Sequence, residues 1–248
     1  MNLKTEQLLA TLEVITEGLW YSTESDAPIK PFVWEFAKKG NFNLINFLTD
    51  KNRLQMVNLS NYSKAYQRAT KTLKHQQPIA LIEELQSHLT DLEFYSVDKD
   101  SLFFQMIVGK TTDDAWVGLT VARSKYCSFG NPLSVKDGYT SQQAEVLLTK
   151  IDPFLQKMKL LLKPELHKDT KIIWEVAASK TEVLIKLVNA CQLVETYQYF
   201  SLQNQELDNF LTNQLQQLRS YVINWNIYAI GQITNEDWLG ISTSGYWS

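Results

Sequence analysis

The sequence predicts an α+β protein made of two tandem α/β/α sandwich domains, each a largely antiparallel sheet flanked by helices. The first observation behind this prediction is an internal repeat: residues 108–120 (VGKTTDDAWVGLT) resemble residues 230–242 (IGQITNEDWLGIS). The identical pairs are Gly109/Gly231, Thr112/Thr234, Trp116/Trp238 and Gly118/Gly240. Such self-similarity indicates one structural unit used twice.

The second observation is the hydrophobic pattern in and before each repeated segment. Each segment contains two strand-like runs joined by a polar turn, LFFQMIVG with AWVGLTV and WNIYAIG with DWLGIST. Polar turn residues between alternating β-rich runs predict a hairpin. Apolar residues spaced by three and four precede each hairpin, over residues 79–92 and 210–218, and predict a helix. Each copy is therefore expected to end in a helix and two strands.

The beginning of each copy matches more loosely. A predicted helix (TEQLLATLEVITEG, with Gly18 as its C-cap, and AEVLLTKIDPFLQKMKLLL) leads into a strand that contains Trp-Glu, at Trp34 and Trp174. The middle segments FNLINFLTD, RLQMVNL, TEVLIKLVNA and QLVETYQYF are rich in Val, Ile, Phe and Tyr and predict further strands. TEVLIKLVNACQLVE also fits a helix.

The boundary between the copies is predicted from composition. The segment YCSFGNPLSVKDGYTS concentrates Gly, Pro, Ser and Asn and has no apolar period, which is typical of a linker. We therefore predict a first domain at residues 1–124, a linker at 125–140 and a second, shorter domain at 141–248.

Composition is that of an ordinary globular protein. The chain has 248 residues, of which 44% are hydrophobic and 21% charged, with a formal net charge of −3. This length can bury a substantial core. No run approaches the roughly 18 apolar residues of a membrane helix, and the start does not resemble a secretory signal. A cytoplasmic location and no contact with a membrane are expected.

No motif indicates catalysis. The two cysteines and three histidines stand in no metal-ligand spacing, and no phosphate-binding loop or nucleophile motif is present. The acidic pairs Asp113–Asp114 and Glu236–Asp237 suggest metal ligands only superficially, because hairpin turns usually carry solvated charge. We predict no catalytic residue, no cofactor and no metal. An enzyme whose site assembles from distant residues is the least supported alternative.

Two segments carry a family resemblance. The run EGLWYSTESDAP followed by FVWEF, and the terminal hairpin ending DWLGISTSGYWS, resemble the nuclease A inhibitor (NuiA-like) family. These are small acidic proteins that block a secreted, sugar-nonspecific DNA/RNA nuclease in cyanobacteria. The resemblance is strongest over residues 6–35 and over both hairpins with their helices. It implies an α/β/α domain without catalytic activity, and a cyanobacterial origin.

The resemblance also implies a site. Family members insert a loop Glu and their C-terminal end at the nuclease's Mg²⁺ centre, and the matching positions are Glu24 and Ser248. A carboxylate suits that place, because a held anion can replace phosphate in an electropositive cleft. The expected partner is a protein, in particular a Mg-dependent nuclease, without direct binding of nucleic acid. The predicted partner-binding residues are Ser22, Thr23, Glu24, Ser25, Asp26, Tyr246, Trp247 and Ser248.

The two copies do not carry this site equally. The second copy has LLLKPELHKD in place of STESDAP, and the first copy continues into the linker instead of ending. The site forms only if the first copy's loop approaches the end of the second. The loop also fits a solvated turn, and Tyr246 and Trp247 either dock back on the domain or contact a partner. The alternative function is an adaptor that keeps the fold and binds another protein through a surface between the domains.

Overall fold

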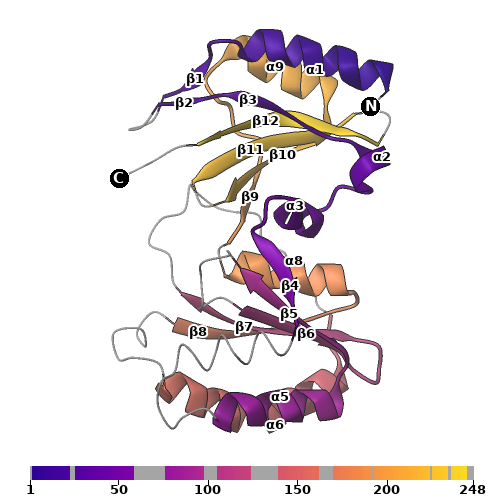
Figure 1. The fold of residues 1–248 in the computed structure, drawn as a ribbon, viewed down its shortest axis with the longest axis vertical. Helices are drawn as coiled ribbons and strands as arrows, with labels where there is room; N and C mark the ends of the chain where they lie inside the picture. The colour runs from indigo at the N-terminus through magenta and orange to yellow at the C-terminus, as the bar shows by residue number, and fades with distance from the viewer. Residues whose placement is uncertain are drawn as a thin grey trace. The chain divides into compact units, whose positions relative to one another are not determined.

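A computed structural model describes residues 2–22, 26–58, 76–97, 105–123, 139–161, 170–191, 193–223, 225–233 and 236–244. The chain forms two compact units. Unit 1 contains the described residues within 1–43 and 193–248, and unit 2 those within 44–126 and 135–192. Each unit therefore combines an early and a late part of the chain (Figure 1).

Unit 1 is built on a five-stranded antiparallel sheet in the order β3-β12-β11-β10-β9. Helices α1 and α9 cover one face of this sheet (Figure 1). The core between them includes Leu12, Leu207, Leu211 and Leu239, all fully buried. The elements are α1 (Leu3–Thr16), β1 (Trp20–Tyr21), β2 (Ala27–Pro28), β3 (Lys30–Trp34), α2 (Phe36–Lys39), β9 (Glu195–Gln198), α9 (Gln205–Gln214), β10 (Gln216–Ile223), β11 (Asn226–Gln232) and β12 (Trp238–Ser244).

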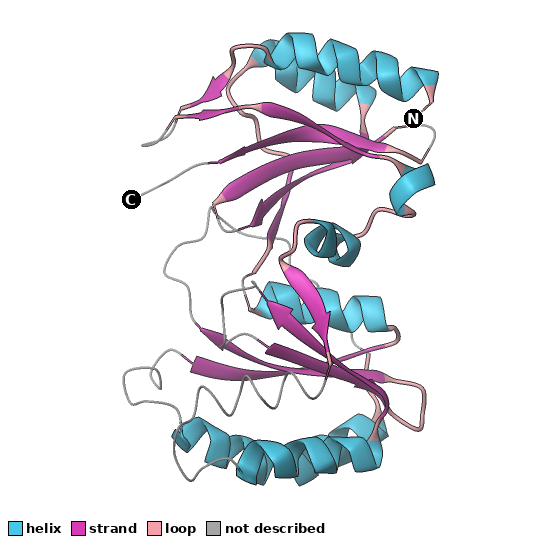
Figure 2. Cartoon of the chain, in the orientation of Figure 1, coloured by secondary structure: helices cyan, strands magenta, loops and turns pink. Residues whose placement is uncertain are grey.

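Unit 2 is a three-layer sandwich. Its antiparallel sheet has the order β4-β5-β6-β7-β8, with α5 and α6 on one face and α8 on the other (Figure 2). The buried core includes Leu85, Val117, Leu147 and Ile151. The elements are α3 (Leu44–Asp50), β4 (Leu54–Val57), α5 (Gln76–His88), β5 (Thr90–Val97), β6 (Gln105–Lys110), β7 (Trp116–Arg123), α6 (Gln142–Leu161), β8 (Thr170–Ala177) and α8 (Lys180–Ala190).

The compact units are interleaved, unlike the consecutive domains predicted at 1–124 and 141–248. In unit 1, β12 pairs with the early strand β3, and Trp238 lies opposite Trp34. In unit 2, β7 pairs with the later strand β8, and Trp116 lies opposite Ala177. Each predicted hairpin is thus flanked by a strand from the other half of the chain. Strand pairing between distant segments is set by packing, which a repeat in the sequence does not specify.

The two predicted hairpins are confirmed and have matching turns. The amide of Thr111 donates to the carbonyl of Ala115 at 2.8 Å, and the amide of Ile233 donates to the carbonyl of Asp237 at 2.9 Å. These pairs occupy corresponding positions in the two repeated segments. The gene duplication itself stays a prediction.

Two of the four predicted middle strands are helices. FNLINFLTD contains α3, and TEVLIKLVNA forms most of α8, whereas RLQMVNL and QLVETYQYF contain β4 and β9 as predicted. At the start of α8, the side chain of Ser179 accepts a hydrogen bond from the amide of Glu182 and acts as the N-cap. Val183 and Leu187 are fully buried one turn apart. Burial at helical spacing outweighs the strand preference of the β-branched Val and Ile residues in this segment.

Strands β5 and β10 were not predicted. The helical spacing of apolar residues continues in the sequence to Leu92 and Leu218, but α5 ends at His88 and α9 ends at Gln214. Both leucines lie in strands next to a register shift, between Thr90 and Glu93 in β5 and within β10. The irregular start of each strand breaks the alternation that would have revealed it.

The Trp-Glu match does not hold in the strand register. Trp174 lies opposite Leu119, whereas Trp34 lies opposite Trp238. Because Trp116 and Trp238 occupy corresponding hairpin positions, the position that corresponds to Trp34 is Ala177 rather than Trp174. Trp34 is a core residue at 2% exposure. A short identical motif is therefore a poor guide to register when the strands come from loosely matched segments.

The first testable prediction concerns acid stability of unit 2. Asp113 in the β6–β7 turn accepts hydrogen bonds from Thr111 Oγ1 (2.5 Å) and from Ser141 Oγ (2.8 Å), and Ser141 caps α6. The hydrogen bond from Thr111, with a smaller contribution from Ser141, holds the pKa of Asp113 below its usual value. A depressed pKa stabilises the fold above the unfolded-state value of about 3.9, and this stabilisation is lost as the pH falls through the folded-state value.

We therefore expect Asp113→Asn to lower the urea midpoint of unit 2 at pH 5. The difference in midpoint between the wild type and the variant should narrow as the pH falls below about 4. Urea unfolding followed by hydrogen exchange of α6 and β7 measures this. A gap of constant size from pH 5 to pH 3 would contradict the assignment. Asp114→Asn is the matched control, because its carboxylate is 84% exposed.

Candidate partner-binding site

A short arm projects from the sheet of unit 1. Strands β1 and β2 pair antiparallel, with Tyr21 opposite Ala27. Ser22 Oγ, next to β1, donates a hydrogen bond to Asp26 Oδ1, next to β2, at 3.2 Å. The two strands thus flank the predicted Ser/Thr/Glu/Asp-rich segment in the sequence.

Local sequence explains the position of the arm. Gly18, predicted as the C-cap of the first helix, follows the C-cap residue Glu17 and has φ +71°, a conformation that favours glycine. The amide of Ile29 donates to the carbonyl of Leu19 at 3.0 Å and closes the base of the arm. Tyr21 faces the core at 9% exposure, and this burial raises its pKa. The arm is therefore anchored by its inward face.

Strand β12 brings the late part of the chain to the same arm. It pairs with β3 as far as Ser242, which lies opposite Lys30. Beyond that pair, Thr243 Oγ1 donates to the carbonyl of Ala27 in β2 at 3.4 Å. Strand β12 ends at Ser244. The strands that lead to the two predicted site segments therefore lie next to each other in one unit.

The predicted site residues are only partly described. Ser22 and Asp26 stand at the two ends of the arm's loop. The other predicted residues lie outside the described part of the chain: Thr23, Glu24, Ser25, Tyr246, Trp247 and Ser248. What the structure brings together is the arm and the end of β12.

Trp20 is a surface feature that the sequence did not reveal. Its side chain is 60% exposed, although it neighbours the buried Tyr21. Successive residues of a strand face opposite sides, so one member of the Trp-Tyr pair must point outward. The sequence contains the pair, but only the strand's orientation decides which ring is exposed. A hollow of about 160 Å³ beside this arm is lined by Leu19, Trp20, Tyr21, Ser22, Ile29, Leu202, Gln203 and Asn204.

The acidic residues of the hairpin turns have structural roles. The expectation of solvated charge is wrong for Asp237, which is 5% exposed and accepts hydrogen bonds from Thr5 Oγ1 (2.6 Å) and the amide of Phe36 (2.8 Å). Asp114 is exposed and pairs with Lys110 at 2.6 Å. Over the described ranges, His, Cys, Asp and Glu side chains form no group of three or more suited to a metal ion.

The described cysteine is poorly suited to nucleophilic chemistry. Cys191 is a free, buried thiol whose pKa is raised to about 11 by burial, so it is a poor nucleophile. None of the helices in the described ranges is long and apolar enough to cross a membrane.

Comparison with known proteins gives one family match. Residues 6–122 match the family model described as nuclease A inhibitor-like protein. This match begins in α1, includes the arm and β3, and ends in β7. It confirms the resemblance over that stretch, while the predicted second copy lies outside the matched residues. No curated protein matches the chain.

Proposed function

We propose, from the match of residues 6–122 to the nuclease A inhibitor-like family, that this chain is a non-catalytic protein that binds and inhibits a Mg²⁺-dependent nuclease. The proposed contacts are the arm loop with Glu24 and the tail residues Tyr246, Trp247 and Ser248. Ser22, Thr23, Ser25 and Asp26 are the other proposed partner-binding residues of this segment.

One observation carries this proposal. The loop comes from the early part of the chain and the tail from the late part, and a two-part site requires them to meet. The pairing of β3 with β12, together with the Thr243–Ala27 hydrogen bond, supports that meeting, because it attaches both segments to unit 1. In this interleaved fold, the strands next to the proposed loop and the strand before the proposed tail belong to one unit, although the loop and the tail come from different predicted copies.

The proposed chemistry is anion mimicry. A nuclease binds phosphate in an electropositive, metal-containing cleft. A carboxylate carried next to the paired strands β1 and β2 can occupy that cleft without offering a bond to hydrolyse. Trp20, exposed beside the loop, adds apolar contact area of the type that dominates interface energies.

The test is inhibition of a Mg²⁺-dependent, sugar-nonspecific nuclease, measured with a fluorogenic DNA substrate, together with calorimetric binding. We expect Glu24→Ala, and separately deletion of residues 246–248, to weaken binding by about 30-fold each, the size of a 2 kcal/mol hot spot. Glu145→Ala is the matched control, because Glu145 is an exposed carboxylate on α6 of unit 2.

The combined variant makes the test sharper. If loop and tail form one site, the double variant loses less than the product of the two single losses, because neighbouring residues couple. Independent losses, or unchanged binding by both single variants, would reject the two-part site. If the wild-type chain binds no such nuclease, the adaptor function takes its place.

A further inference from the structure

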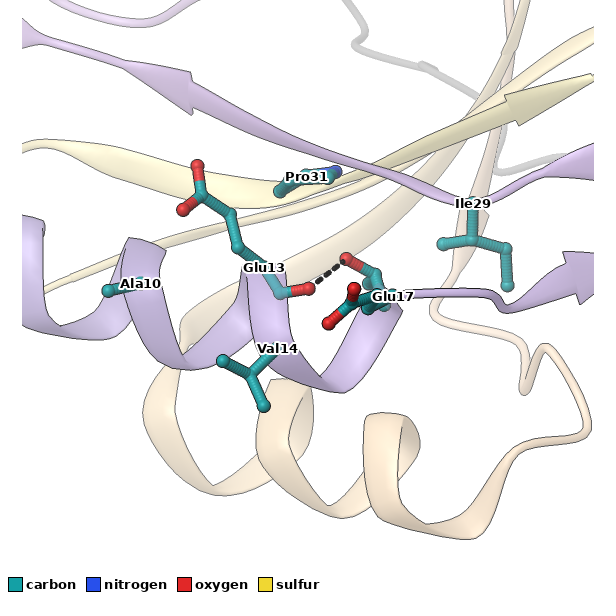
Figure 3. Close-up of a pocket in the computed structure, with 7 residues that line it drawn as sticks. Ala10, Glu13, Val14, Glu17, Ile29 and Pro31 are labelled. Carbon is teal, nitrogen blue, oxygen red and sulfur yellow. Dashed lines mark hydrogen bonds between the residues drawn. The ribbon is translucent and has the colours of Figure 1, made fainter.

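A groove of about 500 Å³ lies beside the base of the arm, between α1 and the outermost strand of unit 1 (Figure 3). Its lining is mostly apolar. The carboxylates of Glu13 and Glu17 add negative charge. The lining residues are Ala10, Glu13, Val14, Thr16, Glu17, Ile29 and Pro31.

The carboxylates of this groove are available for a partner. Glu13 and Glu17 are exposed, and no ion pair in the described ranges involves either of them. Thr16 Oγ1 donates a hydrogen bond to the backbone carbonyl of Glu13, not to its carboxylate. Val14 is 73% exposed at the same groove, an apolar side chain left largely in water. The groove therefore offers two anionic groups next to apolar surface.

The groove is continuous with the arm. Ile29, which lines it, directly follows β2 and also lines the smaller hollow that contains Trp20 and Ser22. The groove and the hollow beside the arm therefore share Ile29 as a lining residue. Strand β3 is an edge strand, and Pro31 within it lacks an amide hydrogen. Recognition here relies on side chains rather than on addition of a strand.

We propose that this groove is a second contact surface for the partner, and that it receives a protein segment with a Lys or Arg next to an apolar side chain. The inference rests on the proposed function, since a protein that binds nucleic acid carries Lys and Arg around its phosphate sites. The cation pairs with Glu13 and Glu17, and the apolar side chain is buried against Val14 and Pro31. Charge complementarity of this kind speeds encounter and selects the partner.

The test uses a short capped peptide of alternating lysine and valine, titrated into the isotopically labelled full chain. We expect the amide resonances of the labelled chain over residues 10–17 and 29–32 to shift, and high salt to weaken binding of the peptide. In Glu13→Gln/Glu17→Gln, affinity is expected to fall about fivefold, as for the loss of two exposed ion pairs. The matched control is Glu145→Gln/Asp152→Asn on α6, which removes the same charge from unit 2 and is expected to leave affinity unchanged.

Several outcomes would overturn the inference: no shifts at the groove, equal binding of an alternating glutamate–valine peptide, or unchanged affinity of the groove variant. The nuclease assay separates this result from the proposed function. If nuclease binding depends on Glu24 but not on Glu13 and Glu17, the groove inference fails and the proposed function stands. If no nuclease binds but the peptide does, the groove is supported and the proposed function fails.

Discussion

Replacing Gly240 with alanine is expected to destabilise unit 1 by about 3 kcal/mol or more, at the upper end of the usual cost of overpacking. A Cβ atom on Gly240 would lie 1.9 Å from the backbone oxygen of Ala229 in β11. Ala229 belongs to a strand paired on both sides, so its carbonyl cannot move aside alone. Urea unfolding combined with hydrogen exchange of β3, β11 and β12 measures the loss.

The corresponding glycine of unit 2 is the matched control. A Cβ on Gly118 would lie 2.6 Å from Leu187 Cδ1 and 2.9 Å from Val183 Cγ2, both side-chain atoms of α8. These atoms can shift, so Gly118→Ala is expected to cost less, about 1–2 kcal/mol, and to act on unit 2. Equal effects of the two substitutions, or protection in β3 and β12 unchanged by Gly240→Ala, would contradict this account.

The second large effect is expected for Asp237→Ala, which should destabilise unit 1 by about 3 kcal/mol. The carboxylate of Asp237 joins three distant parts of the unit, because it accepts from Thr5 near the start of α1 and from the amide of Phe36 at the start of α2. Hydrogen bonds to a charged group are worth about 1.5–3 kcal/mol each, and truncation removes two of them; the Thr5 hydroxyl keeps Asn2 Oδ1 at 3.1 Å as an acceptor, whereas the Phe36 amide loses its bond to Asp237. Hydrogen exchange of α1 should rise together with that of β12.

Two variants define the origin of this effect. Asp237→Asn keeps one acceptor oxygen and is expected to lose less than the alanine variant. Asp114→Asn removes an exposed ion pair with Lys110, which is worth at most about 1 kcal/mol, and keeps a residue type that tolerates the φ of +64° at this position. A loss in Asp237→Ala no larger than in Asp114→Asn would show that the buried hydrogen bonds contribute little.

Local structure could be predicted where a strong period or a specific turn residue decided it. The β6–β7 and β11–β12 hairpins and the end of α1 just before Gly18 belong to this group, because alternation and a left-handed glycine are local signals. Helix α8 was open to either interpretation, since Val183 and Leu187 fit both a strand composition and a helical period. Only burial against the sheet decides between them.

The exchange of strands between the halves could not be predicted. Strands β3 and β8 both follow an amphipathic helix, and either has the composition to flank either hairpin. Their choice depends on side-chain contacts across the sheet, such as Trp34 opposite Trp238, and on buried links such as Asp237 to Thr5. Such contacts join residues more than 200 positions apart and leave no periodic trace in the sequence.

The candidate site shows the same division. The loop and the tail were located as site segments only through the family resemblance of the segments that contain them. The exposure of Trp20 depends on the orientation of β1, and the groove at Glu13 and Glu17 forms where α1 lies beside Ile29 and Pro31. Both are tertiary properties, and no residue type at those positions indicates them.

The pairing of β3 with β12 also dictates the order in which the newly made chain can finish folding. Strand β3 leaves the ribosome early, yet its partner begins only at Trp238, so at about 5–20 residues per second it waits roughly 10–40 s. Unit 2 has all its strands once Ala177 is made, and so can complete its sheet first. During translation, α1 and β3 are therefore made long before β12. A chain that stops before β12 lacks the strand that pairs with β3.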